Sequence, residues 1–131
     1  MPLLLSRSDV ESVLTMPDCL VAIEQAVAEL ARGRALMPQR SVIPVEKHQG
    51  LCLGMPAYIG GGMDALGLKL VTVYPQNPAE HGLPTILGTL LLCDPRTGRA
   101  EAIMDAGHLM AIEKPEEINL AITEFMDKYD L

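Results

Sequence analysis

The stretch "ALGLKLVTVYPQNPAEHGLPTILGTLLLCDPRTGRAEAIMD" (residues 65–105) contains three apolar runs separated by turn residues. The runs 65–75, 85–94 and 99–105 are flanked by Gly, Pro, Asn or Asp, a pattern typical of strands joined by turns. "DPRTG" (94–98) predicts a tight hairpin connection with Gly98 in a left-handed conformation. Because the first two runs are almost continuously apolar, we expect these strands to be buried on both faces or in a subunit interface.

The sequence before this stretch predicts more strands and two helices. "RSVIPV" (40–45) and "LCLGMPAYI" (51–59) are strand-like, and "PLLLS" (2–6) is a short strand. Ser6 with Asp9 resembles a capping box that opens a first helix. A stronger helix starts at Thr15 and ends at Gly33. Its apolar residues fall on one face and are predicted to be core: Leu20, Ile23, Val27 and Leu30.

The end of the chain predicts a third, amphipathic helix. Pro115 is well placed at a first helical turn, and the apolar residues that follow share one face: Ile118, Ile122, Phe125 and Tyr129. The predicted fold class is therefore α/β of the α+β type. We expect one domain over 1–131, with a single mixed sheet, N-terminal helices, a C-terminal amphipathic helix and no Rossmann domain.

Composition excludes several classes of function. The net charge is −7 and the basic residues are scattered, which argues against a nucleic-acid surface. The odd number of cysteines (Cys19, Cys52 and Cys93) includes no CxxC pair, so we expect reduced thiols, no metal site and a cytoplasmic location. The first residues lack the pattern of a signal peptide, and no segment is apolar over a length that could span a membrane.

The run 67–105, with "MPQRSVIP" (37–44) and "GMPAYI" (54–59) before it, closely resembles the substrate and dimerisation domain of the ornithine cyclodeaminase/mu-crystallin family. The resemblance covers residues 1–106. It implies a homodimer, with a nucleotide-binding Rossmann domain inserted after this segment in family members. It also implies that Arg40 and Lys69 correspond to the basic residues that hold the carboxylate of a substrate.

The residues themselves leave two interpretations of each basic side chain open. Lys69 lies inside an apolar strand, where an unpaired ammonium is costly to bury, so it should face a cavity, a carboxylate or solvent; alternatively it is an edge-strand lysine that blocks aggregation. Arg40 suits two-point carboxylate binding, or it is a loop arginine without a special role. His81, in "NPAEHGLP", is predicted to be a turn residue rather than a ligand or proton donor.

The family pattern then breaks. Glu113 aligns with the position where members of this family usually carry an Arg that completes the carboxylate clamp. "GGGMDA" (60–65) formally matches a dinucleotide-binding loop, but it leads into a strand rather than a helix and is predicted to be a glycine turn. Residues 106–131 are too few for a nucleotide-binding domain, which needs about 100 residues. The sequence therefore predicts a truncated domain without a cofactor.

A second resemblance starts at residue 105. "DAGHLMAIEKPEEINLAITEFM" (105–126) resembles the C-terminus of an α/β-hydrolase, which implies that His108 corresponds to the catalytic histidine and that the chain joins two families at residues 105–106. Residues 107–131 would then form a helix that caps the core. A histidine base needs a nucleophile, but no serine lies in a GxSxG elbow, and Cys93 is expected to be an inert strand thiol. His108 can therefore also be interpreted as a helix-entry residue without chemistry.

Two functional hypotheses follow. The first is a non-catalytic, homodimeric domain of the ornithine cyclodeaminase/mu-crystallin type, with weak affinity for a small carboxylate or amino acid through Arg40 and Lys69. The second is a small hydrolase that uses His108. The first hypothesis is favoured because it requires no missing part. Its expected partners are a second copy of the chain and the small ligand, with neither nucleic acid nor a membrane.

Overall fold

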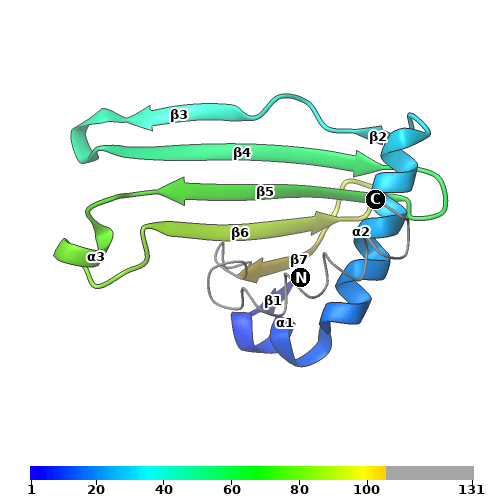
Figure 1. The fold of residues 1–131 in the computed structure, drawn as a ribbon, viewed down its shortest axis with the longest axis horizontal. Helices are drawn as coiled ribbons and strands as arrows, with labels where there is room; N and C mark the ends of the chain where they lie inside the picture. The colour runs from blue at the N-terminus through cyan, green and yellow to red at the C-terminus, as the bar shows by residue number, and fades with distance from the viewer. Residues whose placement is uncertain (106–131) are drawn as a thin grey trace, which may run out of the picture.

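The computed structural model describes residues 1–105, which form a seven-stranded sheet with two helices near one end (Figure 1). The strand order is β1-β7-β6-β5-β4-β2, and β3 also pairs with β4. β1 runs parallel to β7, whereas the other paired strands are antiparallel, so the sheet is mixed as predicted. The strands are β1 (Leu3–Leu5), β2 (Ala35–Leu36), β3 (Ser41–Val45), β4 (Gly50–Ile59), β5 (Ala65–Val73), β6 (Ile86–Cys93) and β7 (Ala100–Asp105).

The register follows from the turn residues that the sequence places between the strands. β4 and β5 pair from Leu51 opposite Val73 to Ile59 opposite Ala65. Gly61 in the connecting turn has φ +64°, a conformation that glycine adopts without steric cost. Gly98 has φ +72° in the β6–β7 hairpin, which confirms the predicted left-handed position.

The two N-terminal helices begin and end where the capping residues predict. α1 (Arg7–Val13) begins with a complete capping box between Ser6 and Asp9. α2 (Met16–Ala31) is capped by Thr15, whose side chain accepts a hydrogen bond from the backbone N–H of Asp18. At its end, the N–H of Gly33 donates to the carbonyl of Leu30 and the N–H of Arg34 to that of Glu29, which is a Schellman motif.

Three short elements were not predicted from the sequence. They are β2, the 3-10 helix η1 (Glu46–His48) and the single-turn helix α3 (Asn77–Glu80). Each has four residues or fewer, too short for a periodic pattern to reveal it. The predicted C-terminal helix and its stripe of Ile118, Ile122, Phe125 and Tyr129 lie outside the described residues.

Because side chains alternate along a strand and paired residues share a face, the register divides the sheet into two faces. The Lys69 face carries Met55, Lys69, Val71, Leu90 and Met104 in adjacent strands, and Val71 is only 2% exposed. The Leu70 face carries large apolar side chains that remain exposed: Leu4, Leu36, Ile43, Leu70 and Leu87. Among residues 1–105, the only buried apolar side chains are those of Val71 and Ala102. The other apolar side chains of the sheet are therefore half-buried or exposed in the described part of the chain.

The predicted core stripe of α2 is wrong for this arrangement. Ile23, Val27 and Leu30 are 58%, 52% and 44% exposed, and only Leu20 of that stripe is half-buried. The buried residue is instead Glu29, which the sequence pattern places off the apolar face. Glu29 is bound by Arg32 and Arg34 at the end of the helix, and its carboxylate lies beside Gly61 in the turn between β4 and β5.

Candidate functional site

Lys69 is the single charge in an apolar row that crosses the sheet. It lies opposite Met55 of β4 and Leu90 of β6, and Leu90 lies opposite Met104 of β7. Its neighbours two residues along β5, on the same face, are Gly67 and Val71. Among residues 1–105, the side chains beside the half-buried Lys69 in the strand register are therefore apolar.

Arg40 comes close to this row through the strand register. It directly precedes Ser41, the first residue of β3, which lies opposite Gly54. Gly54 is followed by Met55, the residue opposite Lys69. Arg40 itself is exposed. The backbone thus brings the two basic residues to the same level of the sheet, with β4 between them.

Neither basic side chain has a protein partner in the described part of the chain. No hydrogen bond or ion pair joins Arg40 or Lys69 to another residue of 1–105. By contrast, Arg7, Arg32, Arg34 and Arg96 each contact a carboxylate. Two basic groups are therefore available to an external anion.

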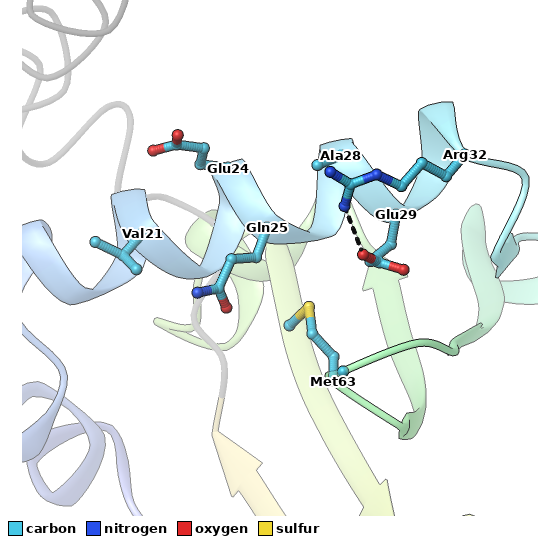
Figure 2. Close-up of a pocket in the computed structure, with 8 residues that line it drawn as sticks. Val21, Glu24, Gln25, Ala28, Glu29, Arg32 and Met63 are labelled. Carbon is cyan, nitrogen blue, oxygen red and sulfur yellow. Dashed lines mark hydrogen bonds and ion pairs between the residues drawn. The ribbon is translucent and has the colours of Figure 1, made fainter.

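A cavity of about 570 Å³ lies elsewhere, between α2 and the β4–β5 turn (Figure 2). Glu24, Gln25 and Arg32 of the helix and Met63 of the turn line it. Glu29 lies at its edge, where Arg32 Nη1 donates to its Oε1 at 2.9 Å. Arg34 also binds Glu29, with Nη2 donating to Oε1 at 2.8 Å. This cavity includes neither Arg40 nor Lys69.

The arginine contacts change the titration of the buried carboxylate. The hydrogen bond from Arg34 holds the pKa of Glu29 below its usual range, with Arg32 adding to the effect against the opposing influence of burial. Sequence reasoning missed this cluster. The sequence Glu-x-x-Arg-Gly-Arg at 29–34 could have predicted the cluster. A Schellman turn folds the residues that follow a helix back toward its last turn, where Glu29 lies.

The glycine turn 60–62 does not have the form of a nucleotide-binding loop. It leads from β4 into β5, as the sequence predicts, and no helix follows it. A Cβ at Gly61 would overlap the carboxylate of Glu29. The glycines therefore allow the turn to approach α2 closely.

Known proteins match both the chain and its fold. The model of the ornithine cyclodeaminase/mu-crystallin family matches residues 1–113. The chain belongs to this family. The Δ1-pyrroline-2-carboxylate reductase of Thermococcus litoralis, whose structure contains NADH and L-proline, is 43% identical with a TM-score of 0.75 over 83% of this chain and 33% of that chain.

Two further family members extend the comparison. An archaeal alanine dehydrogenase dimer with bound NAD is 36% identical with a TM-score of 0.73, over 84% of this chain and 32% of that chain. Ketimine reductase mu-crystallin of Rattus norvegicus is 33% identical over 129 residues, which are 95% of this chain and 40% of that protein. The chain thus spans between about a third and two fifths of the length of these relatives.

The expected α/β-hydrolase C-terminus is not supported. The family model continues to residue 113, past the junction expected at 105–106, and the similarity to rat mu-crystallin covers nearly the whole chain. His108 and Glu113 lie outside the described residues. In the described part of this family member, no helix is both long and apolar enough to cross a membrane.

Proposed function

We propose that this chain is a self-associating, carboxylate-binding domain of the ornithine cyclodeaminase/mu-crystallin family, and that Lys69 and Arg40 bind the carboxylate of a small amino acid or imino acid. The observation that carries the proposal is the ammonium of Lys69, which lies in an apolar row and has no partner among residues 1–105. Holding a charge among apolar side chains is unfavourable unless an opposite charge pairs with it. A bound carboxylate supplies that charge.

The register supports a second contact from Arg40. Adjacent strands lie about 4.8 Å apart, so residues flanking β4 on both sides are separated by roughly 10 Å. The long side chains of arginine and lysine can both reach an anion placed between them. Arginine contributes a fork of two N–H donors, and lysine contributes a point charge.

The apolar row also limits what the ligand carries beside its carboxylate. Met55 and Leu90 flank Lys69 in the strand register. A short aliphatic or cyclic body would contact these side chains, whereas a second charge would lie against them unpaired. The structures of the Thermococcus litoralis reductase with L-proline and of the archaeal alanine dehydrogenase are consistent with ligands of this size in the family.

We further propose that the 131-residue chain does not transfer hydride by itself. The NAD(H)-bound relatives are about three times longer than the part that this chain matches. The one formal dinucleotide motif is a strand-to-strand turn, without the helix N-terminus that binds pyrophosphate. Titration of the chain with NADH, followed by nucleotide fluorescence, should therefore show no saturable binding.

Calorimetric titration with L-proline and L-alanine tests the carboxylate site. We expect binding to L-proline and none to L-prolinamide, which has the same ring without the carboxylate. Lys69→Gln and Arg40→Gln should each weaken binding about tenfold or more, as expected for a charge-assisted hydrogen bond. Arg96→Gln, at a hairpin residue that is 82% exposed, is the control. Equal affinities of the Lys69→Gln and wild-type chains would contradict the assignment.

A further inference from the structure

A second, smaller cavity lies beside α3. Figure 1 shows α3 at the end of the sheet opposite α2. The cavity has a volume of about 280 Å³, and it lies between the β3–β4 connection and the segment that follows β5. Every residue that lines it is polar or carries a polar group: Lys47, His48, Tyr74, Asn77, Glu80 and His81, with two glutamines. This composition separates it from the mainly apolar surface of the sheet.

The donors of this cavity have few partners within the protein. The side chains of Lys47, His48 and Tyr74 form no hydrogen bond or ion pair with another residue of 1–105. Glu80 lies 3.8 Å from His81, but both side chains are more than 60% exposed, so this contact is weak. The cavity therefore holds more hydrogen-bond donors than the described chain uses.

The backbone around the cavity is held in a fixed and partly strained form. Gln49 has φ +52°, a left-handed conformation that is costly for a residue with a side chain. The next residue, Gly50, is buried, and a Cβ there would lie 2.5 Å from the ring of Tyr74. On the other side, Asn77 Nδ2 donates to the carbonyl of Pro84 at 3.0 Å and closes the loop after β5. Strain of this kind persists where surrounding contacts hold it, and it is concentrated at functional sites.

We propose that this cavity is a binding site for a small anion that carries a phosphate or carboxylate group. Lys47 supplies a positive charge, and His48, His81 and the hydroxyl of Tyr74 supply neutral or cationic donors. Glu80 is the one acidic group in the lining, and it is directed toward His81. The volume lies just below that of pockets for drug-sized ligands, about 300 Å³ and above, so the ligand has few heavy atoms. A metal ion is a poor alternative, since no three His, Cys, Asp or Glu side chains of residues 1–105 are arranged to hold one.

The site is separate from the proposed carboxylate site at Lys69. Val73, the last residue of β5, lies four positions beyond Lys69, which is a distance of roughly 13 Å along the strand. The anion site at Lys47 and the carboxylate site at Lys69 can therefore exist independently, and variants of Lys47 and of Lys69 distinguish binding at the two sites.

The test is a titration of the full 131-residue chain with inorganic phosphate and, separately, with acetate, at constant ionic strength. Amide chemical shifts from ¹H–¹⁵N spectra report the position of binding. We expect saturable shifts at Gln49, Gly50 and Asn77, and the anion that gives the lower Kd identifies the preferred group. Lys47→Gln and His48→Gln should each weaken binding about tenfold, whereas Lys47→Arg should retain it.

Lys69→Gln is the control, because it should leave the Kd for phosphate at this cavity unchanged. Because Lys47 and His48 are both exposed, these variants should keep the wild-type spectrum away from the cavity. Two results would overturn the proposal: shifts at the cavity that increase linearly with both anions, or shifts that Lys47→Gln and His48→Gln leave unchanged. Loss of proline binding in Lys69→Gln with phosphate binding intact would support both sites independently.

Discussion

Arg34 binds Glu29 with two hydrogen bonds, from Nε to Oε2 and from Nη2 to Oε1, although the two residues are five positions apart and α2 ends between them. The Schellman turn at Gly33 directs the chain back, and the carboxylate then sits beside the glycine turn between β4 and β5. The ion pair at the end of α2 therefore lies against the turn that joins two central strands of the sheet.

We predict that Glu29→Gln destabilises the protein, because the amide cannot replace a carboxylate that accepts from both Arg32 and Arg34. The melting temperature should fall by about 5 °C, measured by circular dichroism. Glu11→Gln is the matched control, since its pair with Arg7 is about half exposed and such pairs contribute little. A larger effect in Glu11→Gln than in Glu29→Gln would contradict this role.

The same pair predicts a dependence of stability on pH. The hydrogen bond from Arg34 lowers the pKa of Glu29 in the folded state. A carboxylate with a lowered folded pKa stabilises the fold at pH above its unfolded pKa, about 4.3 for Glu, and this contribution is lost as pH falls through the folded pKa. In urea unfolding between pH 3 and 7, the difference between wild type and Glu29→Gln should therefore be constant above about pH 5 and decrease below about pH 4. A difference that grows toward low pH would be inconsistent with the cluster.

Gly50→Ala tests the packing of Tyr74 on the backbone of β4. The new Cβ would lie 2.5 Å from the ring, so the ring must move, and we expect a loss of about 1–3 kcal/mol in the free energy of unfolding. Gly62→Ala is the control, because nothing lies within 4 Å of a Cβ at that position. Denaturant titration of both variants measures the difference, and equal stabilities would show that Tyr74 moves aside freely.

Lys69→Met should stabilise the protein while removing carboxylate binding. Methionine continues the apolar row of Met55 and Leu90, whereas the ammonium has no partner among residues 1–105. We expect the free energy of unfolding to rise by about 1 kcal/mol, because replacing a ligand-binding residue by one that suits its apolar surroundings commonly stabilises a protein. Chemical denaturation measures it, with Lys47→Met as an exposed-lysine control. A clear loss of stability would instead indicate a structural role for the charge.

Leu70→Glu should prevent self-association. Leu70 lies in the central strand β5 and is 41% exposed on a face where Ile43 and Leu87 are exposed too. Monomeric proteins rarely expose large contiguous apolar surfaces, and a second copy that pairs the same faces would cover this one. Sedimentation velocity should show a dimer for the wild type and a smaller species for Leu70→Glu, with Leu70→Ile as the control. A wild-type monomer at micromolar concentration would contradict self-association through this face.

The sequence by itself determined the elements of this protein. Alternation and turn residues predicted six of the seven strands within one or two residues, and Ser6, Thr15 and Gly33 predicted where the helices begin and end. These are local effects, because a cap or a tight turn depends on residues only a few positions apart. The approximate strand pattern also suggested that Lys69 is a charge on an apolar strand.

Only the tertiary structure decided which faces meet. Helical periodicity predicted that Ile23, Val27 and Leu30 are buried, but these side chains are exposed and Glu29, paired with Arg34, is buried instead. The strand register brings Arg40 to the same position along the sheet as Lys69. The tertiary fold also brings Lys47, Tyr74 and His81 together around one cavity. The buried face of α2, the strand register and the cavity lining all depend on contacts between residues far apart in the chain. The hydrophobic pattern within one segment does not predict such contacts.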